Sequence, residues 1–575
     1  MGFKIMKNTK IYYILFFVLF AIFFIFNLFK SPKDMIEPCY FDTAIRVVEY
    51  QICNNLSLAE MDKIWRSVSG STSIYSIDGQ YGLYTTTLYG APLYSLIRFY
   101  LLKLPFHPMI TFNILNLIVA ILFFYASYLL IKLLFDNDTA IKSLLILLSF
   151  YGVYTVTRFA GRGYLVIGLA FILFGCYFIW KSMILEKHRY LIYAGIFMGL
   201  SWTAGNLMSR LTPGFLLVAL IFYIANYFKQ NNFSVKNCSK LLLNLSVFSI
   251  FFVVTSVVII KIISYKFNLD FNSLLLNKKF RIDVAVIPMD YGGVNALPRL
   301  LRRLRLLTGF INYGDYRDHT EEFLYGYALI PNFFVPFLCL SIFYLKKNFK
   351  LKKFQFIYVL IFAASLFVIM FVTPQWSIRY TIVFLPFWAL LVFLGIKYYF
   401  EVLAIKIKNE IYRKIVSGII IIVIAIIYLS KIHNVFFGDY AKSWNNSQFF
   451  AGHRFATDSL VPMRKKYNKT ITLYNDFMFS DQLIAYLDFS PDHKYKSISS
   501  CLDLKAEESE SLPKLFEKYT KECGKVFVII SDGWHYGRLV SAYPNIKLEL
   551  IKKIKLPKLR SFHGTGLKLY CVNGI

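Results

Sequence analysis

Charged residues are scarce in this chain of 575 residues. Only 17% are Asp, Glu, Lys or Arg, against about a quarter in an average soluble protein, and just 33 are acidic. The sequence also lacks an internal repeat, a glycine-rich phosphate loop and any Cys/His spacing typical of a zinc site. We therefore predict no metal-binding residues and no certain cofactor. A divalent cation is compatible with the sequence but is not indicated by it.

Long apolar runs, in contrast, are abundant, since 57% of the residues are hydrophobic and 19% are aromatic. A helix needs roughly 17–25 mostly uncharged residues to cross about 30 Å of hydrocarbon. Eleven stretches meet this requirement, which predicts an α-helical polytopic membrane protein with about 11 transmembrane helices. These stretches are 11–29, 109–134, 140–157, 163–181, 190–208, 212–228, 241–262, 326–345, 354–373, 379–397 and 414–430.

The formal net charge of +31 could suggest a nucleic-acid partner, but the distribution of the charge argues against one. If the N-terminus is cytoplasmic and the spans alternate, Lys and Arg concentrate in the cytoplasmic connections, above all in 346–353 and 397–414. This asymmetry is the positive-inside pattern, and it predicts an N-in, C-out topology. We expect the first span to remain as an anchor, because it is too long for the apolar core of a signal peptide.

This topology places all the sizeable extramembrane segments on the outer face. A transmembrane domain of residues 1–430 would carry outer loops at 30–108 and 263–325, followed by an extracytoplasmic domain at 431–575. Alternating patterns in the last segment predict a small C-terminal α/β domain. The expected elements are strands at Thr470–Tyr474, Lys525–Ile530 and Leu567–Val572 and a helix at Ser509–Thr520.

Three amphipathic segments of the outer loops predict helices that lie along the membrane surface. Phe41–Asn54 and Pro92–Leu104 carry apolar residues at helical spacing, and Leu297–Leu307 adds a strongly basic face. The arginines of the basic segment suit lipid headgroup phosphates, so we expect membrane lipids among the partners. A specific substrate site is the alternative.

Four arginines run against the charge pattern because they lie at outer ends of predicted spans. They are Arg158, Arg162, Arg210 and Arg379, the last followed by Tyr380. A partly buried arginine is costly unless it meets an anion, and its guanidinium can bind phosphate oxygens in a bidentate manner. Snorkelling to headgroups explains any one of them, whereas the set as a whole indicates a lipid-phosphate site.

Carboxylates gather on the same face. Asp34, Glu37 and Asp42 follow the first span, and Asp78 lies further along the same loop. Asp42 and Arg46 are spaced i, i+4 and could form an ordinary surface pair. A carboxylate beside a cationic pocket also suits a sugar transferase, because it can remove a proton from an acceptor hydroxyl while arginines stabilise the leaving lipid phosphate.

Four stretches, taken with their order and topology, resemble the GT-C superfamily of polyprenyl-phosphate-sugar-dependent glycosyltransferases. The chain most resembles the dolichyl-phosphate-mannose-protein mannosyltransferase and aminoarabinose-transferase-like group. Phe41–Arg46 stands where that family has its catalytic Asp, and Tyr89–Leu96 resembles the entry to its second surface helix. Gly199–Arg210 and Arg379–Pro386 resemble two of its spans. The resemblance implies a GT-C-like fold and Asp42 as the catalytic residue.

The chain departs from the family at two positions. Tyr89-Gly90-Ala91 replaces a frequent histidine and proline, and Arg162-Gly163-Tyr164 stands where many members have a second acid. The Trp-Trp-Asp signature of oligosaccharyltransferases is absent from the tail, where Asp532–Gly537 is not a match. These departures argue against a two-carboxylate mechanism and against transfer of a whole oligosaccharide to asparagine.

We therefore expect an inverting transferase that moves a sugar from a polyprenyl phosphate to a hydroxyl of a lipid, a glycan or a protein. Asp42, then Glu37 and Asp34, are the candidate catalytic acids. Arg158, Arg162, Arg210, Arg379, Tyr380 and Asp78 are the candidate substrate-binding residues. A flippase for polyprenyl-linked sugars, a glycan ligase or polymerase, and a non-catalytic glycan-binding protein are the alternatives. Abundant Lys, Asn, Ile and Phe favour a bacterium, whose inner membrane would hold the protein.

Five of the eight cysteines would face the oxidising compartment in this topology. A Cys39–Cys53 disulfide and one pair among Cys501, Cys523 and Cys571 are compatible with their positions. Free thiols throughout are the alternative, because spacing does not determine pairing.

Overall fold

The computed structural model describes the helices and strands of two units, each considered by itself. The described residues are 9–25, 92–101, 108–150, 163–231, 233–267, 271–276, 332–372, 384–407, 409–436, 470–474, 525–531, 544–545, 547–555 and 566–574. Apart from short parts of α6 and α7, the helices belong to one unit, and the strands belong to the other.

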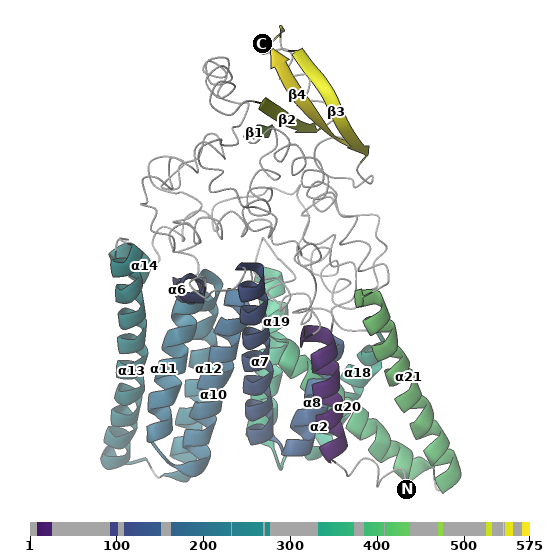
Figure 1. The fold of residues 1–575 in the computed structure, drawn as a ribbon. Coiled ribbons are helices and arrows are strands. Elements are labelled where there is room, and N and C mark those ends of the chain that lie inside the picture. The colour runs from purple at the N-terminus through teal and green to yellow at the C-terminus, as the bar shows by residue number, and fades with distance from the viewer. Residues whose placement is uncertain are drawn as a thin grey trace. The chain divides into compact units, whose positions relative to one another are not determined.

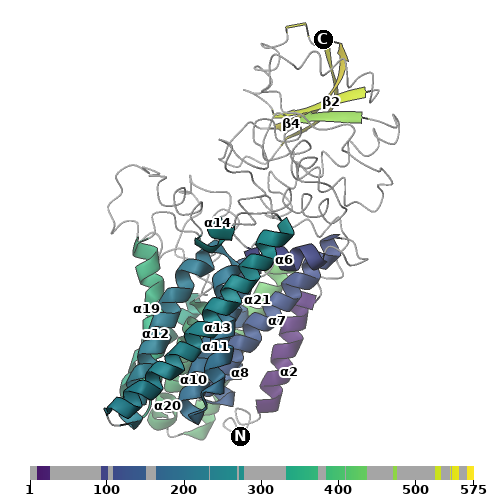
Figure 2. The same ribbon diagram turned by 90° about the vertical axis from the view of Figure 1, so that its left-hand side faces the viewer.

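Each of the eleven apolar runs coincides in part or in full with a described helix, and these helices run side by side in the helical unit (Figures 1 and 2). The first run forms helix α2 with a π-helical turn, η1, at its end. The helices are α2 (Thr9–Phe20) with η1 (Ala21–Ile25), α7 (Pro108–Leu134), α8 (Asn137–Ser149), α10 (Gly163–Leu185), α11 (Arg189–Ala204), α12 (Asn206–Gln230), α13 (Val235–Phe267), α18 (Val335–Asn348), α19 (Lys353–Val372), α20 (Leu385–Lys406) and α21 (Glu410–Phe436).

Within the described part of the chain, six helices are long and apolar enough to cross a membrane. The six segments are Ile114–Leu134, Val166–Leu185, Leu211–Gln230, Val235–Lys266, Leu385–Lys406 and Glu410–Ser430. Two further apolar helices, Thr9–Ile25 and Lys353–Ser365, are shorter in their described extent. The mostly helical, membrane-spanning character is thus confirmed, while the number of eleven spans and their orientation stay predictions.

Glycines allow close contact between the backbones of neighbouring helices. On α11, Gly195 and Gly199 are spaced as in the Gly-xxx-Gly motif of membrane helix pairs and face α13. An ideal Cβ at Gly195 would lie 2.6 Å from the carbonyl oxygen of Phe248, and one at Gly199 would lie 2.8 Å from that of Phe252. On α20, a Cβ at Gly395 would overlap the backbone of Phe337 on α18. Side chains larger than hydrogen would separate both helix pairs.

The connection between α11 and α12 differs from the prediction. The predicted spans 190–208 and 212–228 place the turn between residues 208 and 212. In the structure the break is at Gly205, whose backbone is extended (φ −178°, ψ 161°), and α12 begins at Asn206 with Pro213 inside the helix. Gly205 lacks a Cβ and is a poor helix former, which explains the earlier break. Arg210 therefore lies within α12 and not in the connecting turn.

Short helices accompany the spans. Helix α6 (Pro92–Leu101) confirms a helix in most of the predicted 92–104 segment and buries Leu93, Tyr94 and Leu96. The other short elements are α14 (Phe271–Leu276) and η4 (Asn332–Phe334). The amphipathic segments 41–54 and 297–307 lie outside the described residues.

Four strands form one mixed sheet in the order β1-β2-β4-β3. Strands β1 (Thr470–Tyr474), β2 (Lys525–Ser531) and β4 (Gly566–Gly574) coincide with the three predicted strands. β1 pairs with β2 in parallel, and β4 pairs antiparallel with both β2 and β3. The strand β3 (Lys547–Lys555) was not predicted, because a bulge between Leu550 and Lys552 interrupts the alternation of its side chains.

The sheet matches the predicted strands, and the α/β domain as a whole stays a prediction. Ser509–Thr520 lies outside the described residues, and so do Cys39, Cys53, Cys501 and Cys523. The helix and the disulfides therefore stay predictions. Cys571 on β4 is buried, and its Sγ donates a hydrogen bond to Oδ1 of Asn573 at 3.4 Å.

Candidate functional site

The predicted site residues fall almost entirely outside the described part of the chain. This applies to Asp34, Glu37, Asp42, Asp78, Arg158, Arg162, Arg379 and Tyr380. For Arg210 the structure gives the backbone, in the second turn of α12. The candidate site is accordingly defined by the helix ends that lead into the predicted residues.

A buried hydrogen-bond cluster brings two of these helix ends together. The hydroxyl of Ser201 on α11 donates to the carbonyl of Gly168 on α10 at 2.9 Å and lies 2.9 Å from the hydroxyl of Thr212 on α12. Because Ser201 has one hydroxyl proton, Thr212 is the donor in the second bond whenever Gly168 accepts the first. Ser201 and Thr212 are both fully buried. Gly168 lies five positions beyond the start of α10, and Thr212 lies two positions beyond Arg210 in α12. Ser201 therefore fixes the first turns of α10 against the turn of α12 that follows Arg210.

Stacked aromatic rings join a third helix end to this pair. The ring of Phe215 on α12 lies 4.4 Å from the ring of Phe362 on α19 and 6.3 Å from that of Phe384, as measured between centroids. Phe384 directly precedes α20 and follows Arg379 by five residues. The chain therefore enters α20 beside the turn of α12 that follows Arg210.

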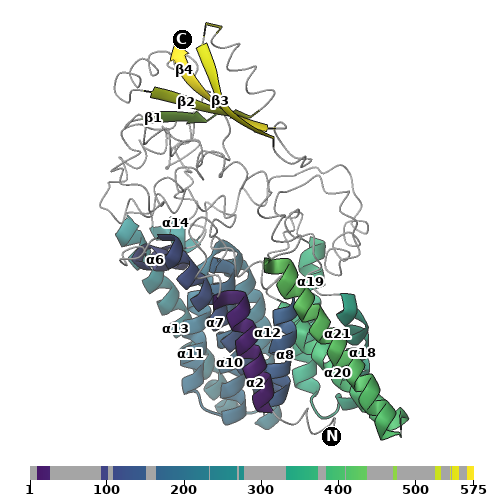
Figure 3. The ribbon, with the colours of Figure 1, turned by 45° about the vertical axis from the view of Figure 1, so that its right-hand side comes forward.

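The end of α8 is fixed to the same group of helices. Phe150, the last described residue before the segment that contains Arg158 and Arg162, is fully buried and lies 6.2 Å from the ring of Phe334. The hydroxyl of Tyr428 on α21 donates to the carbonyl of Leu145. Helices α8 and α20 pack against each other along their lengths (Figure 3).

The helix ends in this region carry no negative charge of their own. α10, α12 and α20 have no acidic residue in their first turns. The first turn of a helix has unpaired N–H groups and about half a unit of positive charge, which together favour an anion. The starts of α10 and α20 are continuous with arginine-bearing segments, and α12 carries Arg210 in its second turn, so this region suits a negatively charged group.

The described residues contain no group of three or more His, Cys, Asp or Glu side chains that could hold a metal ion. Sequence reasoning missed Ser201, Thr212 and Phe215, because their partners lie on other helices. The small residues Gly195, Gly199 and Ser201 are a local sign that this helix packs closely against its neighbours.

Comparison with known proteins gives a fold but no close relative. No protein-family model and no curated protein sequence matches the chain. Among solved structures it is similar to ArnT from Cupriavidus metallidurans bound to undecaprenyl phosphate, with 12% identity, a TM-score of 0.54 and 97% of each chain covered. The apo form of the same enzyme matches with 11% identity, a TM-score of 0.54 and 98% of each chain covered.

A third similar structure is the apo oligosaccharyltransferase of Archaeoglobus fulgidus, with 11% identity and a TM-score of 0.50 over 97% of this chain and 74% of that one. Identities this low establish the fold alone. The chain has the fold of these GT-C glycosyltransferases, as the resemblance of its sequence predicts. With six apolar helices of spanning length among its described residues, it is a multi-pass integral membrane protein.

Proposed function

We propose that this protein is an inverting glycosyltransferase that takes a sugar from a polyprenyl phosphate and attaches it to an acceptor hydroxyl on the outer face of a membrane. The observation that carries the proposal is the fold, which the chain shares over 97% of its length with an ArnT structure bound to undecaprenyl phosphate. The acid-free starts of α10, α12 and α20 add support, because α10 and α20 each follow a segment with a candidate arginine and α12 carries Arg210 in its second turn.

The reaction assigns one role to each set of residues. The carboxylate of Asp42 takes the proton from the acceptor hydroxyl, whose oxygen forms a bond to the anomeric carbon. The bond between that carbon and the phosphate oxygen breaks, and the leaving phosphate keeps the electron pair. Inversion at the anomeric carbon follows from attack opposite the leaving group. The proton then passes from Asp42 to water, which restores the base. Glu37 and Asp34 are the alternative bases.

Positive charge would stabilise the leaving group. Arg158, Arg162, Arg210 and Arg379, with Tyr380 beside them, hold the lipid phosphate as its negative charge increases. The N–H groups at the helix starts add to the same effect. Asp78 contacts the sugar or the acceptor. No step requires a metal ion, although a divalent cation remains compatible with the proposal.

The setting follows from composition and topology. The donor enters laterally from the bilayer, and the acceptor is a lipid, a glycan or a protein hydroxyl. The protein belongs to a bacterial inner membrane in this proposal, with its active site towards the periplasm. Residues 1–430 form the transferase domain, and residues 431–575 form the extracytoplasmic domain.

A transfer assay tests the proposal directly. Protein in lipid nanodiscs is given undecaprenyl phosphate carrying a radiolabelled sugar and a lipid extract that contains acceptors, and released undecaprenyl phosphate is measured. Asp42→Asn should lower its release about 10²- to 10⁴-fold, the usual contribution of a general base. Asp458→Asn, in the C-terminal segment, is the matched control and should have the wild-type rate.

The outcomes separate the alternatives. A flippase would move the labelled donor between leaflets without releasing undecaprenyl phosphate, and a binding protein would retain it unchanged. A ligase or polymerase would release the carrier but would transfer a preassembled glycan. If Asp42→Asn transfers sugar at the wild-type rate, Asp42 is not the base, and Glu37 and Asp34 are tested next.

A further inference from the structure

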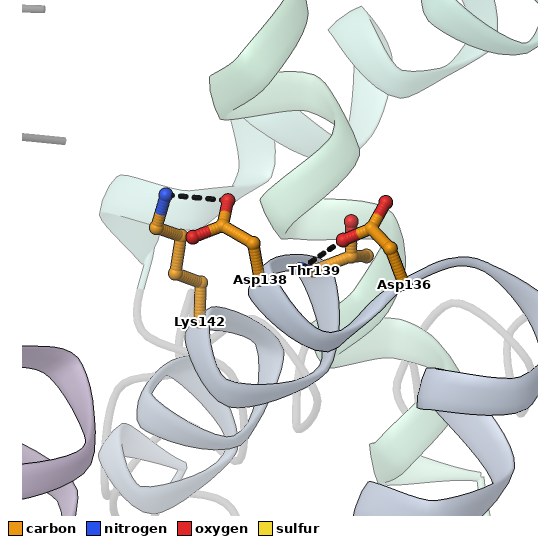
Figure 4. A network of polar contacts seen from close by, with 4 residues as sticks. All are labelled: Asp136, Asp138, Thr139 and Lys142. Carbon is orange, nitrogen blue, oxygen red and sulfur yellow. Dashed lines mark hydrogen bonds and ion pairs between the residues drawn. The ribbon is translucent and has the colours of Figure 1, made fainter. Parts of the chain in front are cut away.

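Helix α8 begins at a polar corner of the helical unit. Asp136 caps the helix, because its Oδ1 accepts a hydrogen bond from the backbone N–H of Thr139 at 2.7 Å (Figure 4). One turn along, Asp138 and Lys142 form an ion pair of 2.6 Å. The α7–α8 connection is therefore fixed by its own side chains, two residues after α7 ends.

Two adjacent tyrosines join α2 to this corner. The hydroxyl of Tyr13 donates to Oδ1 of Asn137 at 2.6 Å and lies 2.7 Å from the hydroxyl of Tyr128 on α7. The hydroxyl of Tyr128 also contacts Oδ1 of Asn137. The three oxygens form one compact cluster that combines α2, α7 and α8.

Tyr12, the neighbour of Tyr13, contacts the ion pair. Nζ of Lys142 lies 4.7 Å from the centroid of the Tyr12 ring and 6.0 Å from that of Phe393 on α20. The Lys142 side chain is only 11% exposed. An ammonium group that is largely shielded from water is attracted to aromatic rings, here in addition to its ion pair with Asp138. Tyr12, Tyr13, Tyr128, Asn137 and Lys142 are together called the tyrosine clamp.

Above the clamp, aromatic packing continues along α2. Phe16 and Phe20 of α2 and Phe24 of η1 lie with their rings 5.6–5.9 Å from the ring of Phe124 on α7. A helix held by directional polar contacts at one end and by packed rings along its length has a fixed axial position. Slippage by one turn would move it by about 5.4 Å.

Three of the helices that lead into the proposed site, α2, α8 and α20, meet at the clamp. α2 and η1 are followed in the chain by the segment with Asp42, α8 by the segment with Arg158 and Arg162, and α20 is preceded by the segment with Arg379. Catalysis tolerates misplacement of reacting groups by only about 1 Å. We infer that the tyrosine clamp consists of positioning residues, which set α2 against α8 and α20 and so align the catalytic base with the phosphate-binding arginines.

This inference rests on the proposed transferase function, and its test separates the two. Lys142→Met removes the ammonium group from the clamp. We expect the folded protein to keep the wild-type KM for the donor within about twofold, while kcat falls at least 10-fold. Lys142→Arg, which retains the charge over Tyr12, should restore kcat to within about threefold of the wild type. We expect kcat to fall without a change in KM because the clamp touches neither substrate.

Lys181→Met is the matched control. Lys181 also contacts two tyrosines, with Nζ 2.9 Å from the hydroxyl of Tyr177 and 4.8 Å from the ring of Tyr190, but these lie on α10 and α11. Its kcat should stay within about twofold of the wild type. Equal losses in the two lysine variants, or an unchanged kcat in Lys142→Met, would overturn the positioning role.

A second measurement does not depend on activity. Hydrogen–deuterium exchange by mass spectrometry should be faster in peptides from residues 9–25 of Lys142→Met and of Tyr13→Phe, and unchanged in those of Lys181→Met. Unchanged exchange in both clamp variants would refute the inference even if the wild type shows no transfer. Absence of transfer by the wild type, with faster exchange in the clamp variants, would instead refute the proposed function and leave the clamp as a structural feature.

Discussion

Replacing Gly195 by alanine tests the close packing of α11 on α13. The added Cβ would lie 2.6 Å from the carbonyl oxygen of Phe248, 3.0 Å from the Cβ of Phe251 and 3.1 Å from the backbone N of Phe252. Two of these three neighbours are backbone atoms, which cannot rotate away. Since ordinary contact starts at 3.4 Å, the helices must separate by roughly 0.8 Å at this point.

The size of the effect follows from that separation. A gap of 0.5–1 Å already removes about a quarter to a half of the dispersion energy of each contact that it opens. Overpacking a well-packed interface costs about 1–3 kcal/mol. Alanine also favours the helix over glycine by about 0.5–1 kcal/mol, which offsets a part of the loss. We therefore expect a net destabilisation of about 0.5–2 kcal/mol.

Reversible unfolding in mixed micelles measures this difference in free energy. Gly418→Ala on α21 is the matched control, because a Cβ there meets nothing within 4 Å and only the gain in helix propensity remains. Gly214→Ala on α12 is equally open. If Gly195→Ala is as stable as these two controls, the backbones of α11 and α13 do not approach each other as described, and the packing argument fails.

Two other substitutions test the hydrogen-bond cluster and the sheet. Ser201→Ala removes the hydroxyl that joins α10, α11 and α12. It should lower the free energy of unfolding by about 1 kcal/mol, because an average interhelical hydrogen bond contributes about 0.6 kcal/mol and this hydroxyl makes two. Ser365→Ala is its control, since the hydroxyl of Ser365 bonds to the carbonyl of Ile361 within its own helix. Lys553→Glu should stabilise the sheet by about 0.2–1 kcal/mol, because Lys553 lies opposite Lys568 and like charges in that position repel. Lys547→Glu lies opposite Gly574 and should give no such gain in melting temperature, whereas an equal gain would assign the effect to net charge.

The helices and strands of this protein could be predicted from the sequence where each depends on a single short stretch of residues. An apolar run of spanning length has no stable alternative to a helix in a bilayer, so each of the eleven runs corresponds to a described helix. Alternating β-branched and aromatic residues were sufficient for β1, β2 and β4. Prediction failed at β3, where Ile551 is bulged. It also failed at Gly205, where a single glycine breaks the helix before the predicted turn between residues 208 and 212.

Contacts between distant residues could not be predicted in this way. Tyr13 and Asn137 are 124 positions apart, and nothing in either neighbourhood specifies the other. The same applies to Phe215 and Phe384, which place the third turn of α12 beside the start of α20. Each candidate arginine could be recognised in the sequence, because it lies at a predicted outer helix end, where the positive-inside pattern predicts few basic residues. The assembly of these arginines into one site depends on tertiary packing and stays a prediction.

The distribution of carboxylates among helix starts is compatible with an anion at the outer ends. Among the described helices that coincide with predicted spans, α8 and α21 have an acidic residue in the first turn, and both are predicted to start on the cytoplasmic side. The other helices predicted to start on that side, α2, α11, α13 and α19, have none. In α8 and α21 the carboxylates neutralise the positive helix start, as Asp136 does by capping α8. The starts predicted to be outer, those of α7, α10, α12, α18 and α20, carry none. A carboxylate in those turns would compete with a lipid phosphate for the same N–H groups. In the proposed enzyme the outer carboxylates are instead supplied by the segment after α2, where one of them can act as a base without occupying the phosphate site.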